Sequence, residues 1–288
     1  MKYIMIFTKN NILRFIFLFC FAITQSQTFK NDSLRGSFTY LLKSKPNNLY
    51  PDFTYEELFA LQISNDRSFF ISEKLLKLDS IYKTEFQKAF NSGSNHIDFR
   101  GKSLPKTNSR FIIIQENDIV QFYDKIGTSL LSYTNPKINN WKLINETKII
   151  NSLVCKKAEL NFKGRNWTAW YSTEIPFPYG PNKFGGLPGL IVKIADKKGD
   201  YDFELVKVTP SSAMKGKVIT IDKSHYENSK LVTKRELLEA KEKDEANIIN
   251  SLESMGTVVT PEQREILRQR QKKNESDKKG YNPIELEE

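Results

Sequence analysis

The segment that decides the fold is CKKAELNFKGRNWTAWYS, residues 155–172. Two runs of alternating apolar and polar residues flank the glycine-containing turn 163–166, and this pattern predicts a β-hairpin. On the second strand, Trp167 and Tyr171 would share one face while Trp170 lies on the other. Aromatic rings on both faces indicate a central strand or a strand with one face lining a groove. Packing between strands is the favoured interpretation.

Outward from this hairpin, short β-rich runs separated by turn residues extend from residue 36 to residue 228. One interior stretch, 73–90, instead places leucine and aromatic side chains mostly on one helical face. We therefore expect an α+β fold with a mainly antiparallel β-sheet and one packed interior helix. A curved sheet or half-barrel is compatible with this pattern. The further expected strands are 37–42, 56–64, 67–72, 110–115, 119–124 and 149–154.

The amino terminus has the pattern of a secretory signal peptide, in which basic residues precede the apolar run 15–23 and a polar stretch follows at 24–27. The apolar run is too short to span a bilayer, which needs roughly 20 residues. We expect cleavage after Ser26, which removes residues 1–26 and exports the mature chain to the periplasm or cell surface without a transmembrane span. A buried amino-terminal helix is the weaker alternative, because this run has no polar face.

A β-rich domain is expected over residues 27–228, and a charged helical extension over 229–288. Basic and acidic residues alternate in the extension, which is typical of a solvated helix face. Nucleic-acid binding is therefore not needed to explain the net charge of +10, although contact with anionic lipid stays open. The extension should contain two helices, each opened by a capping box, and then a mobile end: 233–254, 260–273 and 274–288.

No catalytic residue, metal site or cofactor is predicted. Cys155 would be the one cysteine left after cleavage, and its apolar neighbours favour a place in the core. A nucleophile would need a base, and the sequence has only two histidines, His96 and His225. His96 and Asp98 could meet on one strand face, but nothing marks a third partner. A structural zinc site would need four Cys or His ligands.

Two carboxylates beside the hairpin, Glu159 and Glu174, leave a hydrolase of envelope polymers as the alternative function. For Glu174, contact with the backbone or with Arg165 is the favoured interpretation. The acidic residues of 196–202 are interrupted by Lys-Lys-Gly, which predicts a hairpin turn and not a calcium site.

The most distinctive segment is EIPFPYGPNKFGGLPGLI, residues 174–191. Its proline and glycine content fixes backbone shape more than it supplies reactive groups, and Pro188-Gly189 fits a type II turn. The residues from Leu190 to Ile194 continue as a strand. A phosphate-binding loop is disfavoured because it would have to open a helix.

The hexapeptide at the end of this segment resembles the one that names the GLPGLI family of exported Bacteroidetes proteins. Nearby features agree with the family, including CKKA at 155–158, Gly164-Arg165 and NPIEL at 282–286. The resemblance implies an exported protein of unassigned activity, and it implies no catalytic residues. The motif residues are Gly186, Leu187, Pro188, Gly189, Leu190 and Ile191.

By a looser analogy, such a sheet is similar to the half-barrel of envelope lipid and lipoprotein carriers. The sequence therefore favours a binding or scaffold protein for a lipid, peptide or protein partner, with a largely apolar site. A structural partner of outer-membrane import machinery, bound through the charged helices, is a third hypothesis. The candidate ligand-binding residues are Phe162, Arg165, Trp167, Trp170, Tyr171 and Phe184.

Overall fold

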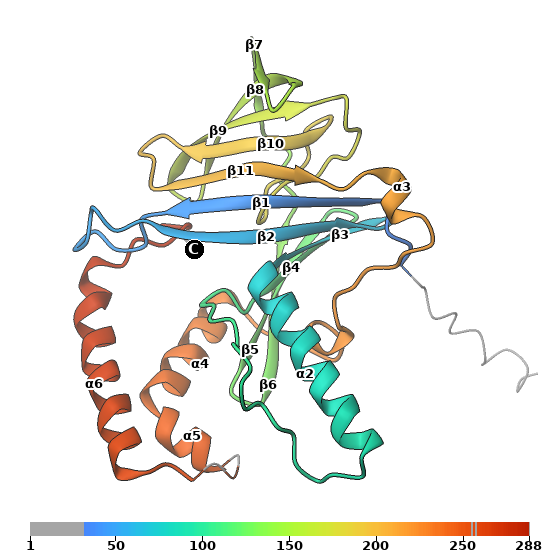
Figure 1. The fold of residues 1–288 in the computed structure, drawn as a ribbon. Coiled ribbons are helices and arrows are strands. Elements are labelled where there is room, and N and C mark those ends of the chain that lie inside the picture. Colours follow the sequence, from blue (N-terminus) through green and yellow to red (C-terminus); the bar gives the residue numbers. More distant parts are fainter. Residues whose placement is uncertain (1–31, 255, 257, 288) are drawn as a thin grey trace, which may run out of the picture. The chain divides into compact units, whose positions relative to one another are not determined.

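One open sheet organises the chain in the computed structural model, which describes residues 32–254, 256 and 258–287 (Figure 1). The expected signal peptide lies outside these residues. Among them, twelve strands form the sheet in the order β12-β6-β5-β4-β3-β2-β1-β11-β10-β9-β8-β7, and every neighbouring pair is antiparallel except β12 with β6. The expected α+β fold with a mainly antiparallel sheet is confirmed.

The strands are β1 (Gly36–Ser44), β2 (Tyr55–Ile63), β3 (Arg67–Ser72), β4 (Ile112–Glu116), β5 (Ile119–Ile126), β6 (Ser129–Pro136), β7 (Lys142–Ile150), β8 (Leu153–Phe162), β9 (Arg165–Ser172), β10 (Leu190–Asp196), β11 (Tyr201–Val208) and β12 (Lys230–Leu231). The helices are α2 (Glu73–Asn91), α3 (Ser211–Met214), α4 (Lys234–Ala246), α5 (Ile248–Ser254) and α6 (Pro261–Asp277), with 3-10 turns η1 (Lys223–His225) and η2 (Lys278–Gly280). No helix in the described part of the chain is long and apolar enough to cross a bilayer.

The hairpin that decides the fold forms as expected. Phe162 of β8 pairs with Arg165 of β9, and the two turn residues between them, Lys163 and Gly164, have φ values of 49° and 77°. Positive φ at both central residues matches the twist of the flanking strands. Strand β9 lies between β8 and β10, so the expected central position is confirmed.

Most other strands were predicted to within a few residues, but the expected strand 149–154 is wrong. Asn151 and Ser152, at φ values of 50° and 65°, instead form the turn between β7 and β8. The sequence also did not predict β6 or most of β7. Strand β7 is an edge strand whose side chains are mostly exposed, so it lacks the alternating apolar pattern of a strand with one buried face.

The sheet has two apolar faces with separate cores. We call the first the tail face, because the C-terminal tail, residues 281–287, packs on it through Ile284. Here Phe38 and Tyr40 of β1 and Phe59 and Leu61 of β2 pack in one cluster with Phe184 and Leu187 of the β9–β10 connection. On the second, the α2 face, Leu75 of α2 packs against Phe69, Ile71, Ile112 and Ile114. Strands β3 and β4 read as continuous apolar runs because both of their faces are covered.

The expected interior helix is confirmed as α2, but only its first half is interior. Ser72 caps it by accepting a hydrogen bond from the backbone N–H of Leu75 at 3.3 Å, and this end packs on β2 and β3 (Figure 1). Further along, Phe86 and Phe90 on the same helical stripe are exposed. The helix is therefore longer than the part of the sheet that covers it.

Both predicted capping boxes open helices, at Thr233 for α4 and at Thr260 for α6. The first helix is interrupted at Asn247, and α6 continues to Asp277, beyond its expected end. The expectation of a mobile end is wrong, because the tail after α6 returns to the tail face and Asn282 is buried there. The small number of apolar residues suggested mobility, but the polar side chains of Asn282 and Glu285 bind the tail to the sheet and its connections.

The glycines of the 186–191 hexapeptide are required by close backbone approach. A Cβ on Gly186, at φ 85°, would lie 2.2 Å from the carbonyl oxygen of Ile138, and one on Gly189 would lie 2.2 Å from that of Ser172. The expected type II turn is absent. The Gly189 N–H instead donates to the Leu187 carbonyl at 2.8 Å, a three-residue γ-turn around Pro188, and Leu190 N–H donates to Ile175 at 3.0 Å.

Replacing Gly186 with alanine should destabilise the protein far more than the same change at Gly199. Both glycines have positive φ, so about 1 kcal/mol of left-handed backbone strain is common to both variants. Only Gly186→Ala adds a clash with backbone, whereas the space around Gly199 is open. We expect Gly186→Ala to lower the free energy of unfolding by about 3 kcal/mol in urea titration. Equal losses in the two variants would contradict the close-approach explanation.

Candidate functional site

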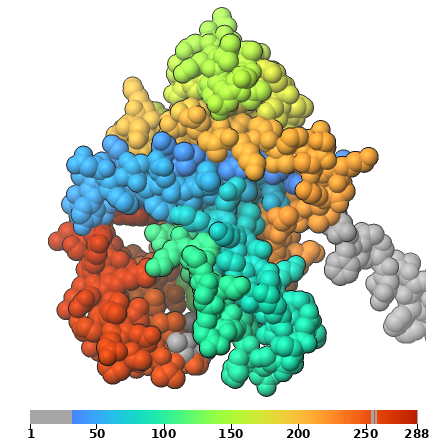
Figure 2. All heavy atoms as spheres, viewed as in Figure 1, coloured from blue at the N-terminus to red at the C-terminus, as the bar shows by residue number. Residues whose placement is uncertain are grey.

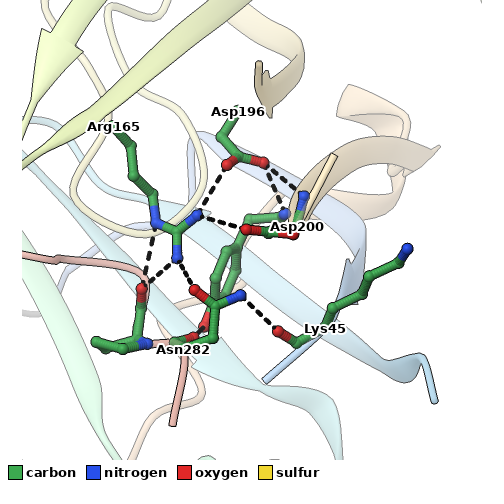
Figure 3. A network of polar contacts seen from close by, with 7 residues as sticks. Lys45, Arg165, Asp196, Asp200 and Asn282 are labelled. Carbon is green, nitrogen blue, oxygen red and sulfur yellow. Dashed lines mark hydrogen bonds and ion pairs between the residues drawn. The ribbon is translucent and has the colours of Figure 1, made fainter. Parts of the chain in front are cut away.

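The most connected polar cluster is centred on Arg165, the first residue of β9 (Figure 3). Its guanidinium, almost fully buried, donates to Asp196 at 2.8 Å and to Asp200 at 3.1 Å, at the two ends of the β10–β11 turn. It also donates to the Asn282 side chain at 2.5 Å and to the Pro283 carbonyl at 2.6 Å. Strands β10 and β11 pair on either side of this turn, which confirms the predicted hairpin turn at 196–202, and two of its acids, Asp196 and Asp200, bind the guanidinium.

Asn282 joins this cluster to the rest of the sheet. Its amide donates to the Lys45 carbonyl at 2.9 Å, and its own carbonyl accepts a hydrogen bond from Tyr201 at 2.6 Å (Figure 3). Burial acts to raise the pKa of Asp200, but hydrogen bonds from Asn282 and Arg165 outweigh it and hold that pKa below its usual value. All of these acceptors come from the protein itself, and those from Asn282 and Pro283 bind the tail to β9.

A second buried ion cluster lies three residues further along the tail. Glu285 pairs with Lys183 of the β9–β10 connection and with Lys234 of α4, the latter at 2.7 Å. Burial lowers the pKa of Lys183, while Glu285 opposes that effect. Burial alone would raise the pKa of Glu285, but the two lysines outweigh it and the net shift is downward. The tail thus bridges the connection and the C-terminal helices.

A row of stacked aromatic rings crosses the tail face beside Lys183. Tyr133 of β6 stacks on Phe122 of β5 at 5.0 Å, Phe122 on Phe111 at 5.1 Å, and Phe111 on Phe59 at 6.1 Å between ring centroids. Phe122 and Phe111 are only half-buried. Lys183 lies 5.7 Å from the Phe122 ring centroid and donates to the Tyr133 hydroxyl at 2.9 Å. We call these four rings the aromatic row.

A buried carboxylate, Glu57, lies on β2 two residues before Phe59 of the aromatic row. It accepts hydrogen bonds from four hydroxyls, those of Tyr55, Ser72 (2.5 Å), Thr107 (2.5 Å) and Ser109 (2.9 Å). Burial, and then the hydrogen bond to Glu57, raise the pKa of Tyr55 to about 12. Two of the donors, Thr107 and Ser109, thereby fasten the segment that precedes β4, and with it Phe111, to the sheet.

The structure brings some of the predicted ligand-binding residues together and separates others. Phe184 packs on Trp167 at 4.6 Å and on Phe162 at 5.9 Å, within the tail-face core. Trp167 is 1% exposed, and Tyr171 is also buried. Trp170 is half-buried and lies within about 6 Å of the ammonium groups of two lysines, Lys148 (5.9 Å) and Lys157 (6.0 Å). Burial of this kind fits the packing interpretation, and ligand binding by these residues stays a prediction.

Residues that we weighed for catalysis are held by other partners. Asp98 binds Arg100 at 2.8 Å on an exposed loop, and no contact joins it to His96. Glu174 accepts a hydrogen bond from the backbone N–H of Val154 at 2.8 Å, so of the two expected contacts the one with the backbone forms, while Arg165 binds Asp196 and Asp200. The described residues contain no group of three or more His, Cys, Asp or Glu side chains that could hold a metal ion.

One His–carboxylate pair was missed. His225 Nε2 lies 2.7 Å from Asp79 Oδ2, which ties η1 to α2. The fully buried thiol of Cys155 matches the expected core role, and burial raises its pKa to about 11, so it is protonated at neutral pH. Neither feature adjoins the aromatic row in the described contacts.

The sequence analysis named Arg165 as a candidate but missed its partner Asn282, the second ion cluster and the aromatic row. Arg165 and Asn282 are 117 residues apart, a separation at which local periodicity carries no signal. For Phe122 a signal existed, because alternation along the predicted strand 119–124 places Val120 and Phe122 on one face. The neighbouring strand β6, which supplies Tyr133, was not predicted, so the row could not be assembled.

Comparisons with known proteins cover only part of the chain. Residues 161–193 match a family described as "Protein of unknown function (Porph_ging)", a stretch that holds Arg165, Lys183 and the hexapeptide. No curated protein matches. Structures of PNGF-II in the P21 and C2 space groups are similar, at 15% and 14% identity and TM-scores of 0.48 and 0.49. Each comparison covers 73% of this chain, which spans 33% of the PNGF-II chain.

Replacing Arg165 with methionine should cost about 3–5 kcal/mol of unfolding free energy at neutral pH, because it leaves buried carboxylates without their cation. The pKa of Asp200 is lowered in the folded protein, so its stabilising contribution is present above about pH 4 and is lost as the pH falls further. The difference between wild type and Arg165→Met should therefore shrink on acidification, as measured by urea unfolding at pH 7 and pH 3.

Arg100→Met is the matched control, since Arg100 forms an exposed ion pair with Asp98. That variant should stay within about 0.5 kcal/mol of wild type at pH 7. A similar loss of unfolding free energy in both variants would show that the buried cluster stabilises the protein no more than an exposed ion pair does.

Proposed function

We propose that the chain is an exported envelope protein of the GLPGLI family that binds an apolar ligand without transforming it. The signal-like residues 1–26 support export, and the hexapeptide supports the family. The observation that carries the binding function is the aromatic row, whose two middle rings, Phe111 and Phe122, are half-buried on the tail face. Half-buried aromatic rings offer a large apolar area for contact with a hydrocarbon ligand.

The surroundings of the aromatic row favour a lipid acyl chain over a peptide. The polar groups that border it, Lys183 and Glu57, are already held by protein partners. Strands β4 and β5, which flank the row, are paired on both sides, so their backbones cannot accept an added peptide strand. At β5, which carries Phe122, the row therefore offers apolar contact area without free backbone groups for a peptide, whereas β6, which carries Tyr133, is covered by β12 over two residues.

The row also lies where a ligand could enter. Phe122 packs at its edge against the cluster that contains Leu237 of α4, and Phe111 ends the segment that precedes β4. Figure 2 shows the surface hollowed between the C-terminal helices, in red, and this preceding segment, in green. We propose that the aromatic row faces this hollow, because a concave site with apolar rings is the usual setting for a small hydrophobic ligand.

Phe122→Ala should weaken binding of a dansyl-labelled undecanoic acid probe about tenfold, because the ring contributes on the order of 1.4 kcal/mol of apolar contact. Titration of dansyl fluorescence measures the dissociation constant. Phe177→Ala is the control, because Phe177 is half-buried on the same face but packs on Phe38, away from the row.

Phe122→Leu, which keeps an apolar side chain, should retain most of the affinity and guards against a folding defect. Wild-type protein that does not bind the probe, or equal weakening by Phe122→Ala and Phe177→Ala, would refute the proposal. Native mass spectrometry of protein purified from its own envelope would identify the natural ligand. A co-purifying peptide in place of a lipid would overturn the assignment to acyl chains.

A further inference from the structure

The second half of α2 carries an aromatic stripe that no part of the sheet covers. Leu75 at the start of the stripe is 5% exposed, whereas Tyr82, Phe86 and Phe90, at intervals of four residues, are 45%, 60% and 73% exposed. Residues four apart lie on the same helical face. The stripe that anchors α2 to the sheet thus continues past it, and exposure rises toward the end of the helix (Figure 1).

The segment after α2 extends this apolar surface. Phe99 packs edge-on against Tyr82 at 4.9 Å, and Ile97 beside it is 41% exposed. We call the surface formed by Tyr82, Phe86, Phe90, Ile97 and Phe99 the aromatic tip. Exposed apolar side chains that occur singly need no explanation, but a contiguous cluster marks a contact surface.

The stretch of sequence that contains the aromatic tip is basic. Residues 77–110 contain seven Lys or Arg residues and three Asp or Glu residues, a net charge of +4 with histidine neutral. The seven basic residues are all exposed: Lys77, Lys83, Lys88, Arg100, Lys102, Lys106 and Arg110.

The three acidic residues of this range are each held by a neighbouring side chain. Asp79 is paired with His225, Glu85 with Lys88 and Lys102 at 3.0 and 2.9 Å, and Asp98 with Arg100. The acids of this range are thus bound locally. Arg110 lies near Asp124 of β5 and Lys83 near Asp222, and the positive charge that remains points to an anionic partner.

We infer that the aromatic tip docks on a lipid bilayer with anionic headgroups. Phenylalanine rings enter the boundary between headgroups and acyl chains, while flanking Lys and Arg side chains bind anionic lipids. A second copy docked through the same surface would bring two +4 regions together, so the charge disfavours self-association. This inference stands independently of acyl-chain binding on the tail face, since the two surfaces share no residue.

The test is co-sedimentation of the full chain with vesicles of phosphatidylcholine alone and of an equal mixture with phosphatidylglycerol. Wild-type protein should bind the anionic vesicles, less so as salt increases. Phe86→Ser/Phe90→Ser should weaken this binding about a hundredfold, because each ring removed from water contributes about tenfold. Both positions are exposed, so the fold should tolerate the change.

The matched control is Leu143→Ser/Ile149→Ser, which alters two exposed apolar side chains of edge strand β7. It should bind anionic vesicles as wild type does. A second measurement uses Phe90→Trp, whose added fluorescence should shift to shorter wavelength with anionic vesicles.

Three results would overturn the inference. The first is no binding of wild type to anionic vesicles, and the second is equal binding by wild type and Phe86→Ser/Phe90→Ser. The third is concentration-dependent self-association of wild type that this variant abolishes, which would assign the tip to a second copy of the chain.

Discussion

The buried guanidinium of Arg165 is the constraint on which the rest of the structure depends. Arginine cannot lose its charge in a protein, so its burial requires a full set of acceptors. No single segment supplies them: two carboxylates come from the β10–β11 turn, and an amide and a carbonyl oxygen come from the tail. The hairpin, the turn and the tail must therefore assemble together.

The tail also fixes the position of side chains beside the aromatic row, the surface that we propose binds ligand. Once Asn282 is fixed, Glu285 lies where it pairs with Lys183, and Lys183 in turn lies over Phe122 and Tyr133. The hexapeptide has a complementary role, because its glycines allow the backbone of the connection to pass close to Ile138 and Ser172. The hexapeptide, Lys183 and Glu285 thus serve mainly to hold the β9–β10 connection against the tail face of the sheet.

The features that sequence predicted well are those set by neighbouring residues. The β8–β9 hairpin, the start of α2 and both capping boxes depend on side chains within a few positions of one another. The tail was misjudged because its stability comes from Arg165 and Lys183, more than 100 residues away. Edge strand β7 was missed because solvent exposure removes the pattern that identifies a strand. The aromatic row needs the order of strands β2 to β6, which no local pattern contains.

An open sheet has two outer strands whose unpaired backbone groups could recruit another chain. At one border, β12 adds just two residues in parallel to β6. At the other, β7 carries Lys142 and Lys148 and is distorted by a bulge between Ile144 and Thr147. Lysines and bulges hinder the regular pairing on which fibril growth depends, so this border is protected against aggregation even though Leu143 and Ile149 face the solvent.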